Sequence, residues 1–371
     1  MAALEESRTC ANMEALLDSL LQSEPDLGDP LGYRLAWGKL KVDQYPIMTT
    51  KQVDAFRRDG AVLLSFGESR IIQDDTLRVT PSTRQTGNVG LNTVADYMLL
   101  AVAKQVVQLM PAVVCDVQSF EELYDGRLIT DILPEAKHTT YDGSIRERDH
   151  TRVKEDAMRL HVDDCDHLLR APVQLLLGIK NVKGTATTVA LTPPDADLHK
   201  EGIDPEILRS NSYKHKPPNI LSVDEDDIPL RPVLYGTSDA PQIQADWKST
   251  SAISDQALEA WKSLHGLLQR QQHVPENWPA HKSPAGFLGE FALGPGDILV
   301  LDNYRTLHGR GALEPVCGLE HRRWVKRLWL SGTNQEEELQ HCKASQEQPR
   351  VFCRRKAYWS GKSRCHPCSS T

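Results

Sequence analysis

The chain has 371 residues and a formal net charge of -8, and 40% of its residues are hydrophobic. This is the composition of an ordinary globular protein, and its acidic balance disfavours a nucleic-acid partner. The first residues lack a basic segment followed by an apolar run, so no secretory signal is expected. No apolar stretch approaches the about 20 residues that cross a membrane. We therefore expect a cytoplasmic protein without a membrane partner.

The sequence divides into three parts. Residues 1–48 predict a polar N-terminal extension with one short amphipathic helix near 13–21. Residues 49–332 predict a single domain, with a β-rich core over 120–332. After residue 332 the strand rhythm is lost, so residues 333–371 predict a peripheral or disordered tail.

Two helices and a strand are predicted in the first third of the chain. Thr49 and Thr50 can cap a helix that ends at Gly60, before the apolar strand 61–64. A second helix is predicted over 94–109, with its cap supplied by residues 91–93.

Beyond residue 121 most of the signals are those of short, branched, apolar strands. The predicted strands cover 127–133, 172–179, 187–191, 297–301 and 324–330. A long helix is predicted over 254–268, and the Pro-, Asp- and Lys-rich segment 193–233 is expected to be a long loop or lid. Strands that do not alternate regularly with helices favour a closed or double-layered β structure over a doubly wound parallel sheet.

A histidine followed two places later by a carboxylate can point both side chains to one face of a strand. Such a pair supplies two of the three ligands of a 2-His-1-carboxylate iron site, which leaves positions open for oxygen and substrate. The chain has two such pairs, His161/Asp163 and His199/Glu201, and chance alone gives about two. The second pair lies in a polar segment and is interpreted as a solvated face. The first precedes an apolar strand and is the candidate metal pair.

A second group of polar residues lies far downstream. A Gly-Pro-Gly-Asp turn and a buried strand precede a predicted turn that carries His308. The strand 322–330 then places Arg323 and Arg327 on one face. Arginine is costly to bury without an anion, and its planar fork can bind both oxygens of a carboxylate. Beside a metal, such an arginine can hold the distal carboxylate of a chelating 2-oxo acid. The alternative for each arginine is an ion pair with a protein carboxylate.

Five ordered blocks resemble the clavaminate synthase-like branch of the taurine dioxygenase superfamily. The blocks are 126–134, 161–181, 187–192, 293–315 and 322–330. Within this branch the chain is most similar to the bacterial oxygenases that hydroxylate free arginine or asparagine at the β-carbon. The resemblance implies a mainly β fold with flanking helices, namely a double-stranded β-helix (jelly roll) of the cupin-like kind.

The resemblance also implies a set of ligands. Carried over by position, the ligands of Fe(II) are His161, Asp163 and His308. Arg323 would bind the 5-carboxylate of 2-oxoglutarate with the help of Thr188, or of Thr187 if the register is one residue off. The implied substrate contacts are Arg327, Thr130, Asp131 and Asp246.

The implied activity consumes O2 and converts 2-oxoglutarate to succinate and CO2. It couples this conversion to the hydroxylation, or a related C–H oxidation, of a small amino acid or amino-acid-derived metabolite, in secondary metabolism. Thr130 and Asp131 stand where the family carries a glutamine, and Asp163 stands where its amino-acid oxygenases carry glutamate. The identity of the substrate and the oligomeric state therefore stay open.

Two other classes of protein remain as alternatives. One is a non-catalytic jelly-roll protein that binds a metal or ligand, and the other is a peptide or protein hydroxylase that uses segment 193–233. The three ligand types together with Arg323 argue against the first. In the basic tail, Cys365 and Cys368 form a lone CxxC motif. This is a weak zinc signal, because no second spaced pair accompanies it.

Overall fold

The computed structural model describes residues 2–22, 30–67, 93–110, 114–118, 129–133, 157–163, 165, 170–216, 228–272, 287–313 and 323–332. The tail predicted over 333–371, with its CxxC motif, lies outside the described residues. None of the helices in the described ranges is long and apolar enough to cross a membrane.

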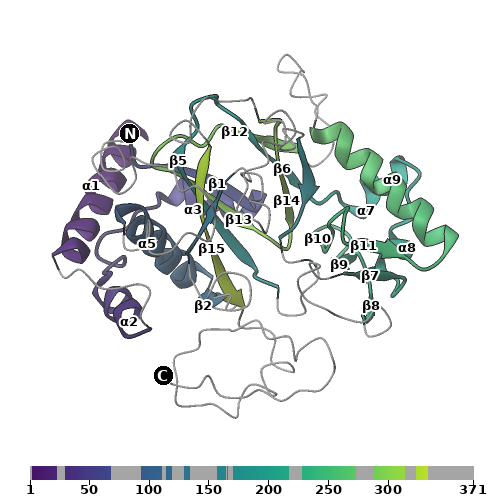
Figure 1. The fold of residues 1–371 in the computed structure, drawn as a ribbon, viewed down its shortest axis with the longest axis horizontal. Helices are drawn as coiled ribbons and strands as arrows, with labels where there is room; N and C mark the ends of the chain where they lie inside the picture. The colour runs from purple at the N-terminus through teal and green to yellow at the C-terminus, as the bar shows by residue number, and fades with distance from the viewer. Residues whose placement is uncertain are drawn as a thin grey trace, which may run out of the picture.

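Two antiparallel sheets form the centre of the described structure (Figure 1). The larger has the order β1-β13-β5-β15-β2, and β3 also pairs with β15. Its strands are β1 (Ala61–Ser65), β2 (Val114–Gln118), β3 (Ile129–Ile132), β5 (Val173–Lys180), β13 (Asp297–Asp302) and β15 (Trp324–Gly332). The smaller has the order β12-β6-β14-β4. Its strands are β12 (Phe287–Phe291), β6 (Thr187–Leu191), β14 (Thr306–Arg310) and β4 (Met158–His161).

The inner faces of the two sheets share one apolar core. Leu176, Leu299 and Val325 of the larger sheet pack together with Val189 of the smaller sheet. All pairings within both sheets are antiparallel. The prediction of a mainly β protein with flanking helices is therefore confirmed at this level.

Helices cover the outer face of the larger sheet. They are α1 (Ala2–Leu21), α2 (Pro30–Lys39) and α5 (Val94–Leu109) (Figure 1). The predicted start of α5 is confirmed, because Thr93 and Asp96 form a reciprocal capping box. The chain before residue 49 was expected to be a polar extension with a short helix. Instead, α1 runs over 20 residues and its apolar stripe joins the same core as α5. The reason is the helical spacing of Met13, Leu16, Leu17 and Leu20, all of which are buried.

The outer face of the smaller sheet is covered by α9 (Asp255–Gln272) and a group of short elements. These are α7 (Asp195–Lys200), α8 (Pro205–Arg209), β7 (Tyr213–His215), β8 (Leu230–Arg231), β9 (Leu234–Gly236), β10 (Pro241–Ile243) and β11 (Thr250–Ala252). The expectation of a long loop over 193–233 is therefore wrong where that segment is described. Its Asp and Pro residues begin helices: the Asp204 side chain caps α8, and Pro205 occupies the first turn. Leu208 and Tyr213 are fully buried beneath α9.

The predicted helix that ends at Gly60 is confirmed as α3 (Thr50–Asp59). Thr49 and Gln52 form its capping box, and Gly60 ends it with a left-handed φ of 70°. Glycine is required at this position, because a Cβ there would lie 2.9 Å from Cγ2 of Thr306. This turn therefore brings α3 close to the beginning of β14.

Candidate metal centre

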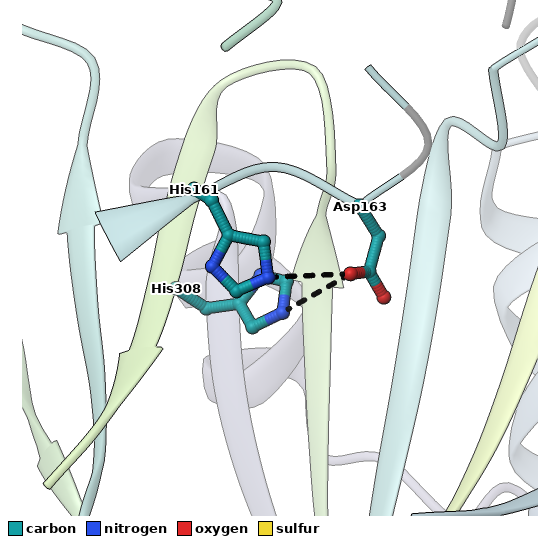
Figure 2. A group of neighbouring side chains, drawn as sticks. All are labelled: His161, Asp163 and His308. Carbon is teal, nitrogen blue, oxygen red and sulfur yellow. Dashed lines mark ion pairs between the residues drawn. The ribbon is translucent and has the colours of Figure 1, made fainter. Parts of the chain in front are cut away.

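Three side chains that can bind a metal converge where β4 and β14 pair (Figure 2). His161 ends β4 and stands opposite His308 of β14. The Nε2 atoms of His161 and His308 lie 3.4 and 3.8 Å from Oδ1 of Asp163. Donor atoms that share one ion at about 2.0–2.2 Å lie about 3 Å apart. The trio therefore fits a single metal ion after small adjustments.

Strand pairing and two hydrogen-bond systems set these positions. His308 lies within β14 and not in the predicted turn, because this strand pairs with β6 on one side and β4 on the other. Nδ1 of His161 lies 2.9 Å from the carbonyl oxygen of Arg159. This contact favours the tautomer that donates from Nδ1 and leaves Nε2 for a metal.

Asn303 holds the backbone of Asp163 from both sides. Its Oδ1 accepts the Asp163 N–H at 3.2 Å, and its Nδ2 donates to the Asp163 carbonyl at 3.0 Å. The same Nδ2 donates to the Ala171 carbonyl at 2.9 Å. The sequence analysis missed Asn303, although its place directly after a buried strand was visible.

Burial and charge give Asp163 and His308 the protonation states that bind a metal. Burial raises the pKa of Asp163, but the charge of Arg327, 2.8 Å from Oδ2, and the two histidines hold that pKa well below its usual range. Burial lowers the pKa of His161, but the hydrogen bond and charge of Asp163 outweigh it, so the pKa is raised. Burial and the charge of His161 lower the pKa of His308 to about 3. Asp163 is therefore a carboxylate and His308 a neutral imidazole.

Arg323, which directly precedes β15, lies among other cationic and hydroxyl groups. Its Nη2 donates to Oγ1 of Thr187 at 2.9 Å, and its buried Nε has no hydrogen-bond partner. Burial, and then the charge of Arg310, lowers the pKa of Arg323 to about 10. Within the described ranges no carboxylate pairs with Arg323. A buried guanidinium of this kind can bind an anion.

The structure corrects the choice between two adjacent threonines. Thr188 stands opposite Gly309, whereas Thr187 stands opposite Arg310, two residues beyond His308. Because side chains alternate along a strand, Thr187 faces the interior with His308, and Thr188 faces the opposite side. The hydroxyl beside Arg323 therefore belongs to Thr187.

The structure also separates the two adjacent residues predicted to touch the substrate. Thr130 stands opposite Arg327 on the inner face of the larger sheet. Asp131 stands opposite Lys326 on the outer face, where Nε1 of Trp324 donates to it at 2.7 Å. Asp131 is thus not brought to the candidate site, because strand alternation turns it toward the helices.

Arg327 and Asp246 both lie near the trio. The guanidinium of Arg327 lies 3.7 Å from the centre of the Trp329 ring while it donates to Asp163. The charge of Asp246 contributes to raising the pKa of His161. The backbone beside it is fixed, because the Ala245 carbonyl accepts the N–H of the residue that follows His161.

Comparisons with known proteins identify similar chains, although no family model matches. The L-ornithine/L-arginine 3-hydroxylase of Catenulispora acidiphila is 24% identical over 342 residues, which cover 84% of this chain and 89% of the relative. The structure of an asparagine oxygenase with Fe(II), 3-hydroxyasparagine and succinate has a TM-score of 0.64 at 18% identity, over 94% of this chain and 97% of that one.

A third similar protein is the non-haem iron oxygenase OrfP in complex with Fe and alpha-ketoglutaric acid. It has a TM-score of 0.62 at 20% identity, and the match covers 92% of this chain and 96% of that one. The predicted resemblance to the amino-acid oxygenases is therefore confirmed in sequence and in fold.

Proposed function

We propose that this chain is an Fe(II)- and 2-oxoglutarate-dependent oxygenase of the clavaminate synthase-like branch, which oxidises a small amino acid or amino-acid derivative. One observation carries the proposal. His161, Asp163 and His308 offer donor atoms within 4.8 Å of one another, and among the described residues the buried Nε of Arg323 has no hydrogen-bond partner. Structural neighbours that bind iron and alpha-ketoglutaric acid support it.

The donor set fits Fe(II). Two imidazole nitrogens and one carboxylate oxygen are typical of non-haem iron oxygenases, and they leave coordination positions open for other ligands. His161, Asp163 and His308 would hold the ion. Bound iron supplies the activation of O2 that is coupled to the conversion of 2-oxoglutarate to succinate and CO2.

The remaining residues orient the reactants. Oδ1 of Asp163 faces the two histidines while Arg327 binds Oδ2, so one oxygen stays available to the metal. Arg323 and Thr187 would bind the 5-carboxylate of 2-oxoglutarate, which gives the buried Nε of Arg323 an acceptor. Thr130, Arg327 and Asp246 are the proposed substrate contacts.

We further propose that the two central sheets are the halves of a double-stranded β-helix, or jelly roll. Their antiparallel pairing and shared inner core support this assignment. The proposed domain runs to residue 332 and includes α1, which packs in the same core as α5. The peptide-hydroxylase alternative loses its support, because the loop on which it depended contains α7 and α8.

Anaerobic absorbance on addition of Fe(II) and 2-oxoglutarate tests the proposal. We expect a visible metal-to-ligand charge-transfer band, which His161→Ala abolishes and Arg323→Ala weakens. His199→Ala is the matched control, because His199 belongs to the second His-x-carboxylate pair and lies exposed on α7. A folded wild-type protein that gives no band would overturn the oxygenase assignment and favour a non-catalytic binding protein.

A further inference from the structure

Gln174 is a buried side chain without a hydrogen-bond partner. It lies on β5 with an exposure of 0%, and neither its amide oxygen nor its amide nitrogen makes a hydrogen bond within the part of the chain that the structure describes. Nearly all buried polar atoms in proteins are paired, because an unpaired one destabilises the fold. A donor and an acceptor left open on one side chain therefore mark a place where a bound group can complete them.

Gln174 faces the interior between the two sheets. Its chain neighbours Val173 and Leu175 belong to the helix-covered core, so the alternation of side chains turns Gln174 the other way. In the register of β5 and β15 it stands opposite Trp329. The ring of Trp329 lies 3.7 Å from the guanidinium of Arg327, the residue that also binds Asp163. Two residues, Trp329 and Arg327, thus connect Gln174 to Asp163 of the candidate metal centre.

Thr130 provides a second open group on the same face. Its Oγ1 is buried and makes no hydrogen bond. Thr130 stands opposite Arg327 on one side of β15, and Leu176, two residues from Gln174, stands opposite Arg327 on the other side. Diagonal neighbours in a sheet lie about 7–8 Å apart, within the reach of long side chains. Thr130 and Gln174 therefore flank Arg327 from its two neighbouring strands.

The chemistry of Gln174 selects a neutral group that both donates and accepts. A carboxylate would pair with the amide nitrogen and leave the oxygen open, and an ammonium group would do the reverse. A cation would also lie close to the positive charge of Arg327. Arg327 is already paired with Asp163 at 2.8 Å, so the selection rests mainly on the two open atoms of Gln174. A carboxamide satisfies both atoms of Gln174 at once.

We propose that Gln174, assisted by Thr130, is the specificity subsite of this enzyme and binds a neutral carboxamide group of the substrate. This inference rests on the proposed oxygenase function. Gln174 is a recognition residue here. It has no part in binding the metal or 2-oxoglutarate, which belong to the trio and to Arg323.

Turnover of matched amino acids tests the subsite. Substrate-dependent succinate formation is measured for asparagine against aspartate and for glutamine against glutamate, with ornithine as the cationic probe. We expect kcat/KM for one carboxamide to exceed that for its acid and for ornithine by at least about 100-fold, because a site built for hydrogen bonds rejects analogues that leave its groups unpaired. Gln174→Leu is expected to cut this preference below about 10-fold, mainly through KM.

Stability provides a readout that does not depend on turnover. Gln174→Leu removes an unpaired amide, so the Tm of the ligand-free protein is expected to equal or exceed that of wild type. Gln105→Leu is the matched control. Gln105 is also buried, but its Oε1 accepts the Ile47 N–H at 2.9 Å, so its loss is expected to lower Tm and leave substrate preference unchanged.

The outcomes separate this inference from the function on which it rests. Absence of the charge-transfer band with Fe(II) and 2-oxoglutarate overturns both. A normal band with a wild-type preference for an acid or a cation, or with no turnover of either carboxamide, overturns the subsite alone. The subsite is also overturned if Gln174→Leu lowers Tm as Gln105→Leu does and keeps the wild-type preference, because Gln174 would then be paired structurally.

Discussion

Cations are buried on both sides of β15, but the charged groups around Lys326 and Arg323 differ. On the outer face, Nζ of Lys326 lies 2.9 Å from Asp96 and 3.5 Å from Asp131. Burial lowers the pKa of Lys326, but these carboxylates outweigh it, so that pKa is raised. On the inner side, at Arg323 directly before β15, burial lowers the pKa to about 10, and within the described ranges no carboxylate opposes the shift.

This difference separates a structural charge from one that is open to a ligand. Lys326, Asp96 and Asp131 are satisfied by one another, and Asp96 also caps α5. Such a closed cluster holds helix and sheet together. The inner face keeps open hydrogen-bonding atoms on Arg323, Thr130 and Gln174. A buried polar group left open by its own chain therefore indicates a binding site more directly than a buried charge does.

The largest expected effect on the inner face comes from the metal trio. His308→Ala is expected to weaken Fe(II) binding by well over 100-fold, since even residues that only support ligands contribute about 10–100-fold. Isothermal titration under anaerobic conditions measures this loss of affinity.

His215→Ala is a matched control. Burial, and then the charge of Arg231, lowers the pKa of His215 to about 3, the same value as that of His308. His215 instead bonds Thr250, so its variant should lose stability and keep the metal. Equal metal affinity in the two variants would contradict the assignment.

A substitution on the outer face should change the stability of the protein and leave metal binding unchanged. Lys326→Met leaves Asp96 and Asp131 buried without their cation, so we expect a loss of about 3–5 kcal/mol in the free energy of unfolding. Chemical denaturation measures this loss, and the Fe(II)–2-oxoglutarate absorbance of the folded fraction should not change. Lys262→Met, at an exposed Lys–Glu pair, should cost less than about 0.5 kcal/mol. Loss of the absorbance with normal stability would reverse the roles of the two faces.

A smaller effect on Fe(II) binding is expected from Asn303, which supports the backbone of Asp163. Asn303→Ala removes the clamp on the Asp163 backbone and should weaken Fe(II) binding by about 10–100-fold. The control is Asn181→Ala, because Asn181 makes the same two kinds of side chain–backbone bond, with Thr185. If both variants bind Fe(II) like wild type, Asn303 serves only the turn between β13 and β14.

The smallest effect distinguishes the two adjacent threonines. Thr187→Val removes the hydroxyl that accepts from Arg323, and a hydrogen bond of about 1 kcal/mol corresponds to an about fivefold change in the KM for 2-oxoglutarate. Thr188→Val should leave this KM unchanged, because Thr188 points to the other face of β6. A larger effect at Thr188 would restore the register expected from the sequence.

The sequence predicted the helices and strands better than it predicted on which face of a strand each side chain lies. Helix 94–109 and strand 187–191 are confirmed with their bounds, because their caps and branched residues are local signals. Thr188 was expected beside Arg323 with Thr187 as the alternative, and Asp131 was expected near the substrate. The structure places Thr187 beside Arg323 and Asp131 on the outer face, a distinction that sequence does not give because adjacent residues of a buried strand look equally apolar or polar. Segment 193–233 was mistaken for a loop, because Asp and Pro both begin helices and break them.

The site was predictable where its chemistry is unusual. His161, Asp163 and His308 stand out as residue types, and the structure brings them together. Asn303 and Gln174 do not stand out, because a single amide beside apolar residues has no pattern of its own. They differ from ordinary core residues only in the hydrogen bonds that Asn303 makes and that Gln174 does not make within the described structure.

The register of β14 has a consequence for how the proposed site forms. His308 and Arg310 lie two residues apart on this strand, and Thr187 stands opposite Arg310 on β6. A slip of β14 by one residue would turn His308 and Arg310 away from the interior together. The proposed iron ligand His308 and the proposed anion site beside Arg310 therefore depend on one strand register. If the proposed site is correct, binding of Fe(II) therefore also reports that β14 has its native register.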